Sequence, residues 1–164
     1  DRASDLGERL GPVLLQLPSS FHADADTIGR LDACLRRFPR AVRVAVELRH
    51  SSWWEGEAER ELRQVLERHG AALCWADRWS RPVTPLWRTA PWGYVRLHGG
   101  AAQPPPRYGR QALTSWAHRI ADAWGEKDDV YVYFNNDTGG AAVADATRFA
   151  RTAASLRRTV TRTP

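Results

Sequence analysis

Five short apolar runs recur along the chain, and each changes to polar or charged residues at its carboxyl end. The runs are residues 14–16, 42–47, 73–77, 94–98 and 131–136. Segments with helical periodicity follow most of them. This layout is typical of a parallel α/β protein, in which ligands bind at the carboxyl ends of the strands. The pattern therefore predicts the position of a site, at the carboxyl ends of the strands, but not its function.

The same periodicity predicts an alternation of strands and helices within one domain of 164 residues. The predicted strands are residues 12–17, 42–48, 71–76, 94–98 and 130–134. We expect the first helix to be capped by Asp24 or Asp26 and to carry one apolar face (Ile28, Leu31, Leu35, Phe38). Further helices are predicted at 55–69, 111–124 and 141–156. Residues 78–93 show no helical period and are predicted to form a long surface connection.

The two faces of the predicted strands differ in character. In the fourth strand Val95 and Leu97 point one way, whereas Arg96 and His98 point the other. A strand between two helix layers is apolar on both faces. One apolar and one polar face suits a barrel, with helices outside and a polar lumen inside. The alternation therefore predicts a barrel and not an open, doubly wound sheet.

Composition excludes several classes of protein. Hydrophobic content of 43% and eight Trp favour a packed globule. No run reaches the ~18 apolar residues of a membrane span, and no signal peptide is visible, so we expect a cytoplasmic protein without membrane contact. The net charge of +5 comes from basic residues spread along the chain, which does not favour a nucleic-acid surface. Cys34 and Cys74 are predicted to be buried free thiols.

Polar side chains gather at the predicted carboxyl ends of the strands. Those expected at one end of the lumen are Gln16, Glu47, Asp77, Arg96, His98 and Asn135. Because a guanidinium keeps its proton, Arg96 in mid-strand requires a carboxylate partner, for which Glu47 and Asp77 are the candidates. A purely structural ion pair is the alternative.

Two histidines, His50 and His98, lie near strand ends beside these carboxylates, which favours acid–base chemistry. We take Glu47, Asp77, Arg96 and His98 as the catalytic candidates. The same residue types could hold a divalent metal, but no spacing is diagnostic, so no metal ligands are assigned and no cofactor is identified. Neither Cys lies at a strand end, and no Gly-x-Ser-x-Gly motif supports a nucleophile.

The ligand-binding candidates come from the strand ends and the loops that follow them. They are Gln16, Arg49, His50, Trp53, Tyr133, Asn135, Asn136, Asp137 and Gly139. Residues 135–140 lead directly into the last predicted helix, whose N-terminus could cradle an anion. The alternative is an ordinary N-cap formed by Asp137 or Thr138.

Five tryptophans lie in or beside connections that follow strands. They are Trp53, Trp54, Trp79, Trp87 and Trp92. Aromatic side chains at such places stack on sugars or bases, or they roof the core. Roofing is the more common outcome.

Four sequence blocks resemble the signature blocks of the YecE-like family, domain of unknown function 72. They are Leu-Gly-Pro-Val-Leu-Leu-Gln-Leu-Pro (10–18), Val-Ala-Val-Glu-Leu-Arg-His-Ser-Ser-Trp (44–53), Tyr-Val-Arg-Leu-His-Gly (94–99) and Val-Tyr-Val-Tyr-Phe-Asn-Asn-Asp (130–137). They follow the family's order and cover nearly the whole chain. The resemblance implies a TIM-type barrel related to sugar isomerases.

Family members carry about three further βα units before the first of these blocks. The resemblance therefore implies that this chain holds the last five of eight strands, forms the C-terminal portion of a barrel, and lacks any functional residue on the first three. Five parallel strands cannot close a barrel, so we expect open strand edges and self-association. Such a fragment is expected to have little activity alone.

Three hypotheses for function follow. The first is a protein that binds a small polar ligand, sugar-like or phosphate-like, with isomerase or hydrolase chemistry by Glu47 and Asp77, a proton shuttle at His98, and charge stabilisation by Arg96. The second is a nucleic-acid-binding or nucleic-acid-processing barrel, in which Arg49, Arg96 and the loop tryptophans meet phosphates and bases. The third is a non-catalytic scaffold. Salt dependence separates the first two, because binding to a polyanion weakens steeply as salt rises.

Overall fold

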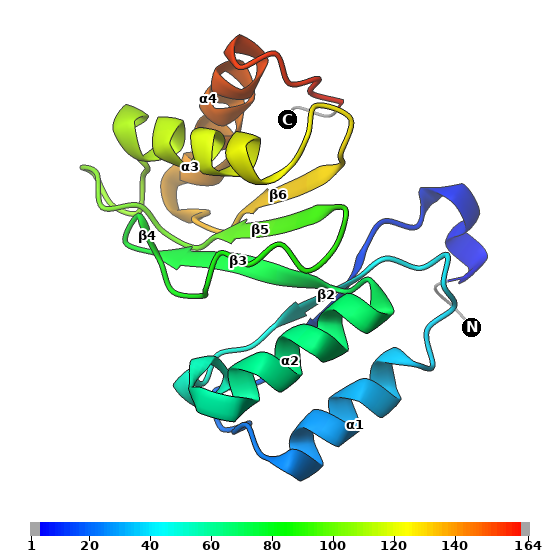
Figure 1. The fold of residues 1–164 in the computed structure, drawn as a ribbon. Coiled ribbons are helices and arrows are strands. Elements are labelled where there is room, and N and C mark those ends of the chain that lie inside the picture. Colours follow the sequence, from blue (N-terminus) through cyan, green and yellow to red (C-terminus); the bar gives the residue numbers. More distant parts are fainter. Residues whose placement is uncertain (1–3, 162–164) are drawn as a thin grey trace. The chain divides into compact units, whose positions relative to one another are not determined.

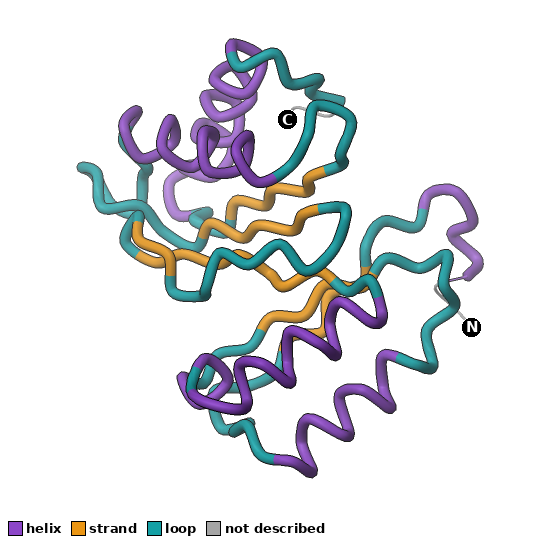
Figure 2. Tube along the Cα trace, viewed as in Figure 1, coloured by secondary structure: helices purple, strands orange, loops and turns teal. Residues whose placement is uncertain are grey.

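The chain has an α/β fold, described here by a computed structural model over residues 4–161 (Figure 1, Figure 2). Five strands run parallel: β1 (Val13–Gln16), β2 (Val44–Glu47), β3 (Ala72–Arg78), β5 (Gly93–Leu97) and β6 (Val130–Phe134). The α-helices are α1 (Ala25–Leu35), α2 (Gly56–His69), α3 (Arg110–Ala123) and α4 (Ala141–Ser155). Short 3-10 helices are η1 (Ser4–Arg9), η2 (Ser51–Trp54) and η3 (Thr138–Gly140). The predicted α/β class and parallel strands are confirmed.

The chain divides between Leu73 and Cys74 into two compact units. In the first unit β1 pairs in parallel with β2, and β2 pairs with Ala72 and Leu73 at the start of β3. The α1 helix begins at Asp24, whose carboxylate accepts from the Thr27 amide at 2.7 Å, so Asp24 and not Asp26 is the cap. The α2 helix ends where Gly70 adopts φ 60°, a conformation that glycine tolerates.

The core of the first unit follows the predicted apolar faces. In Figure 1 both helices lie on the same side of β1 and β2. The buried side chains of this layer are Ile28, Leu31, Leu35, Val44, Val46, Leu62, Val65 and Leu66. Cys34 lies just outside this stripe and is exposed, so its predicted burial is wrong, whereas Cys74 in β3 is buried.

In the second unit β3 pairs with β5, and β5 with β6, all in parallel. The α3 and α4 helices pack on one face, where Trp75, Val95 and Leu97 join Trp116 and Phe149 in the core. The opposite face carries Tyr94, Arg96 and Tyr133 by strand alternation. Helices thus cover one face of the strands, as the difference between the two faces predicted.

The connection predicted for residues 78–93 contains an element that the sequence did not reveal. β3 turns directly into β4 (Arg81–Pro82) and forms a tight antiparallel hairpin. Beyond β4, the buried hydroxyl of Thr84 accepts from the Ala76 amide at 2.9 Å and donates to the Cys74 carbonyl at 3.2 Å. One side chain therefore continues the pairing of β3 after β4 has ended.

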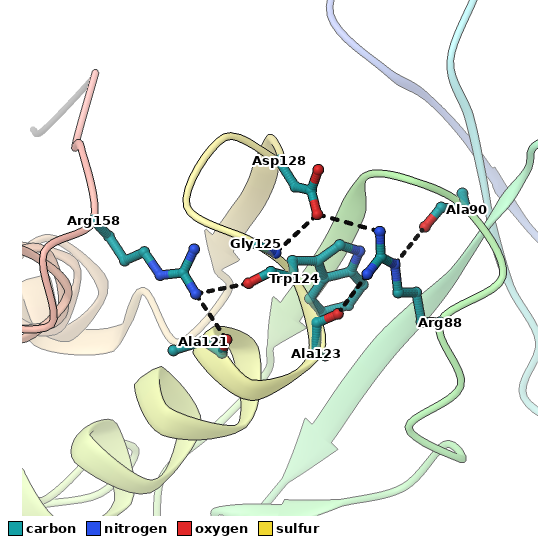
Figure 3. A network of polar contacts seen from close by, with 8 residues as sticks. All are labelled: Arg88, Ala90, Ala121, Ala123, Trp124, Gly125, Asp128 and Arg158. Atoms are coloured by element: carbon teal, nitrogen blue, oxygen red, sulfur yellow. Dashed lines mark hydrogen bonds and ion pairs between the residues drawn. The ribbon is translucent and has the colours of Figure 1, made fainter.

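Two arginines hold the end of α3 (Figure 3). Arg158, after α4, donates to the carbonyls of Ala121 and Trp124 at 2.7 and 2.6 Å. Arg88 donates to the Ala123 carbonyl at 3.0 Å and pairs with Asp128 at 3.2 Å. These carbonyls have no partner within the helix, and cations are favourable there because the helix dipole is negative at this end.

No helix within residues 4–161 combines the length and the apolar character needed to cross a membrane.

Candidate functional site

The carboxyl ends of β1 and β2 bring together three of the predicted ligand-binding or catalytic residues. Arg49 Nε donates to Glu47 Oε1 at 3.0 Å, and its NH2 group donates to Gln16 Oε1 at 3.1 Å. The parallel register explains the contact, because Gln16 and Glu47 are direct partners. Glu47 is 2% exposed, whereas Gln16 and Arg49 reach solvent. The Gln16–Glu47–Arg49 cluster is therefore a buried carboxylate joined to a solvent-facing guanidinium.

A second group of side chains lies in the loops that follow β1 and β2. The rings of His22 and His50 have centroids 3.8 Å apart, and His50 Nδ1 lies 2.8 Å from Ser52 Oγ. His50 Nδ1 also accepts a hydrogen bond from the Ser52 amide at 3.2 Å. An accepting nitrogen carries no proton, so in the neutral tautomer of His50 the proton lies on Nε2. Sequence reasoning missed His22. His22 could have been proposed from the sequence, because it lies in the loop that directly follows the first predicted strand.

Trp53, another predicted ligand-binding residue, lies in the packed interior of the first unit. It is fully buried, and its indole Nε1 donates to the Phe21 carbonyl at 2.8 Å. Phe21 stacks on it with ring centroids 5.9 Å apart. This environment is that of an aromatic residue roofing a core.

Asp77 occupies a place different from the predicted one. It pairs in register with Leu97 and shares the face of Trp75, so it points into the α3 layer and away from the face of Arg96. Its Oδ1 accepts from the Tyr108 hydroxyl and from the His98 amide, and its Oδ2 accepts from Trp116 Nε1 at 3.1 Å. The predicted convergence of Asp77 with Arg96 is therefore wrong.

Burial dominates the electrostatics of Asp77. It raises the pKa of the Asp77 carboxyl to about 6, although the bonds from Tyr108, the His98 amide and Trp116 act in the opposite direction. Burial and the neighbouring Asp77 likewise raise the pKa of the Tyr108 hydroxyl. The Gly99 amide donates to that hydroxyl at 3.0 Å, so the carboxylate also holds the start of the loop after β5.

A second buried carboxylate, Asp145 of α4, holds neighbouring loops in place in the same way as Asp77. Its Oδ2 accepts from the Tyr108 amide at 2.8 Å and from Asn136 Nδ2 at 2.9 Å. Asn136 also donates to the Pro106 carbonyl at 3.1 Å and is 2% exposed. The predicted ligand-binding residue Asn136 thus joins the end of β6 to α4 and to the loop before α3.

The remaining candidates of the second unit lie on the face that α3 and α4 leave uncovered. Arg96 is half-buried, and its Nε donates to Asn135 Oδ1 at 3.2 Å. Tyr133 is 42% exposed beside Arg96, and His98 is half-buried at the end of β5. Glu47, the other carboxylate considered for Arg96, belongs to the first unit, so that pairing stays a prediction.

The loop before α4 has no side-chain cap. Gly140 precedes the helix with φ 70°, and neither Asp137 nor Thr138 holds an amide of the first turn. The N-cap interpretation is therefore wrong. Anion binding by residues 136–140 stays a prediction. Within the described chain, no group of three or more His, Cys, Asp or Glu side chains is arranged to hold a metal ion.

Comparison with solved structures shows a shared fold. Two crystal structures of a DUF72 family protein of Enterococcus faecalis V583 match with TM-scores of 0.76 and 0.75 at 23% and 20% identity. They cover 93% and 90% of this chain, which spans 63% and 60% of theirs. A DUF72 family protein of Thermotoga maritima MSB8 matches with a TM-score of 0.72 at 23% identity, over 92% of this chain and 59% of its own.

A search of curated proteins finds no significant match. A family model described as "Protein of unknown function DUF72" matches residues 1–164. The four YecE-like blocks pointed to the same family. The chain belongs to the DUF72 family.

Proposed function

We propose that the protein binds a small polar ligand of the sugar type at the carboxyl ends of β1 and β2. The observation that carries the proposal is the Gln16–Glu47–Arg49 cluster, in which a 2% exposed carboxylate is joined to a guanidinium that is 42% exposed. Placing a carboxylate in a nearly dry site is costly unless its interactions compensate. Charged groups at this end of parallel strands commonly serve ligands.

The chemistry of the cluster favours a neutral, hydroxylated ligand over a phosphate. Glu47 and Gln16 offer acceptor oxygens, and Arg49 offers donors, so the cluster matches hydroxyl groups that both donate and accept. A phosphate would meet the Glu47 carboxylate as a like charge. Acid–base chemistry of the isomerase or hydrolase kind would fall to Glu47, because Asp77 is enclosed by Tyr108 and Trp116.

The proposal includes a TIM-type barrel as the finer description of the family fold. One-sided helix coverage in each unit and parallel strands joined by helices support this fold. A doubly wound sheet carries helices on both faces. In a barrel of this type the strand ends of Gln16 and Glu47 lie at the face where active sites are built.

Calorimetric titration with neutral monosaccharides, the same sugars as phosphate esters, and inorganic phosphate tests the proposal. We expect a neutral sugar to bind with an affinity that changes little with salt, because no counterions are released. Glu47→Gln keeps the shape of the side chain and removes its charge, so it should weaken binding about 10-fold to 100-fold. Arg49→Ala should weaken binding as well.

Arg40→Ala, at an exposed arginine of the same unit, is the matched control and should leave binding unchanged. The proposal fails if every bound compound is a phosphate, or if Glu47→Gln binds the sugar as tightly as the unaltered protein. Far-ultraviolet circular dichroism of each variant verifies that the fold is retained.

A further inference from the structure

The tip of the β3–β4 hairpin is a well-defined turn that plays no part in the proposed function. Trp79 and Ser80 form its two-residue turn with φ of 55° and 61°, and Arg78 pairs with Arg81 across it. Such turns favour Asn-Gly, because both central residues adopt the left-handed conformation. A tryptophan there is strained. Backbone preference therefore does not account for Trp79.

Trp79 also differs from the other tryptophans in its exposure. It is 60% exposed, whereas the other seven are buried or half-buried. In the part of the chain that the structure describes, the side chains of Arg78, Trp79 and Arg81 make no hydrogen bond, ion pair or ring contact. An indole and two guanidinium groups thus face solvent together at one turn.

The charges at this turn favour an anionic ligand. Arg78 and Arg81 are direct cross-strand partners, and like charges in such a pair destabilise a hairpin. Alternation along β3 places Arg78 on the face of Ala76, the register partner of Arg96, and opposite to Asp77. The hairpin therefore adds positive charge to the face that already carries Arg96. An anion between the two arginines would relieve their repulsion.

The hairpin tip is held in place by the loop after β5. The Ser80 amide donates to the Gly99 carbonyl at 3.1 Å, and the Ala101 amide donates to Ser80 Oγ at 3.1 Å. The Gly99 amide is itself bound by the Tyr108 hydroxyl, which donates to Asp77. The exposed indole thus stands on a fixed base, which lowers the entropic cost of binding.

We propose that this hairpin tip binds single-stranded nucleic acid, with a base stacked on Trp79 and neighbouring phosphates held by Arg78 and Arg81. Stacking on an aromatic side chain beside cationic groups is how single strands are bound without sequence preference. A neutral sugar could stack on the indole but has no charge to pair with the two arginines. An acidic polysaccharide would use the arginines but offers no planar base to stack on the indole. The proposal is independent of the Gln16–Glu47–Arg49 cluster.

Fluorescence anisotropy with a labelled oligothymidylate tests the proposal on the whole chain. We expect binding that weakens with salt, with a log–log slope of about −1.4 for two phosphate contacts to a single strand. Trp79→Ala should lower the affinity about 10-fold, and Trp79→Phe should retain most of it. Arg78→Ala combined with Arg81→Ala should remove most of the salt dependence. Arg151→Ala, at an exposed arginine of α4, is the control.

A stability measurement separates a binding role from a structural one. Asparagine tolerates the left-handed conformation better than tryptophan, so Trp79→Asn should raise the melting temperature while it abolishes stacking. A structural role predicts the reverse, a lower melting temperature. Binding by the variant Trp79→Asn at the affinity of the unaltered chain would overturn the proposal.

Competition experiments distinguish a nucleic acid from other anionic ligands. Thymidine monophosphate should compete weakly with the oligonucleotide, because it offers one base and one phosphate. Heparin, an acidic polysaccharide without bases, should bind with no loss of affinity in Trp79→Ala. Equal loss of heparin and oligonucleotide binding in that variant, or no binding of the oligonucleotide at low salt, would contradict recognition of a base.

Discussion

At the scale of single residues, Asp77 shows how burial decides what a carboxylate can do. Its two oxygens accept from Tyr108, Trp116 and the His98 amide, and the side chain is fully buried. These donors hold the ends of β3 and β5 beside α3. A carboxylate enclosed in this way stabilises the loop that carries His98 and Gly99.

The raised pKa of Asp77 makes stability depend on pH. Because the pKa is about 6 in the folded chain and ordinarily 3.8, the folded state holds the proton more tightly than the unfolded state. The contribution is fully present below 3.8 and is lost as pH rises through about 6. This difference in pKa corresponds to ~3 kcal/mol of unfolding free energy.

Asp77→Asn should abolish this dependence. Urea unfolding between about pH 4 and pH 7 should show the unaltered protein losing ~3 kcal/mol relative to the variant as pH rises. Tyr108→Phe removes a bond that lowers the pKa of Asp77, so its loss of stability should extend to higher pH. Parallel pH profiles for Asp77→Asn and the unaltered protein would show that Asp77 does not titrate as described.

At the scale of elements, the end of α3 depends on residues far away in the sequence. Arg158 donates to two of its terminal carbonyls, and Arg88 donates to a third (Figure 3). We expect Arg158→Ala to lower the unfolding free energy by ~1–2 kcal/mol, because two carbonyls lose a charged donor. The neighbouring exposed Arg157 provides the control, and Arg157→Ala should change stability by less than ~0.5 kcal/mol.

Thermal and urea unfolding of both variants measure this difference. Equal effects of Arg158→Ala and Arg157→Ala would mean that the contacts in Figure 3 contribute nothing specific. The comparison also shows whether the segment after α4 is part of the cooperative unit that α3 belongs to.

The elements themselves were largely predictable from the sequence. The predicted strand at residues 130–134 coincides with β6, and α2 begins and ends within one residue of its predicted limits, since Gly70 is a strong stop signal. β4 was missed, because a two-residue strand that includes a proline carries no periodic signal.

The candidate site was predictable only where the strands alternate clearly. Gln16 and Glu47 were expected at the same end of the strands, and the parallel register makes them direct partners. Asp77 was placed on the wrong face, because residues 72–76 are apolar on both faces and give no alternation to follow. His22 was missed because it lies in a loop, where contacts depend on the fold and not on a period.

At the scale of the whole molecule, the two edges of the strand order are the feature from which we predict association. β1 and β6 each pair with a single neighbour among the described strands. Unpaired backbone groups at a sheet edge recruit other strands. We therefore expect concentration-dependent self-association of this chain, measurable by sedimentation velocity. Leu14 lies on the same face of the strands as its register partner Ala45, which is the face opposite to Val46 and the helices. Leu14→Lys therefore puts a charge on an edge strand without entering the helix layer. It should reduce association, because charges on edge strands oppose pairing with another chain.

A monodisperse monomer across the accessible concentration range would contradict this expectation. Val143→Lys provides a control, since Val143 is 59% exposed on α4 and lies outside the sheet. Association that Leu14→Lys and Val143→Lys reduce equally would point to a general effect of charge instead of strand pairing.

The hydroxyl of Thr84 has a consequence for misfolding. By binding the Ala76 amide and the Cys74 carbonyl, it occupies backbone groups through which a foreign strand could dock on β3, the strand with the longest buried run. Pairing of this kind with another chain is one route to aggregation and amyloid. We therefore expect Thr84→Val, which removes both hydrogen bonds, to form fibrils faster than the native chain, as measured by thioflavin T fluorescence.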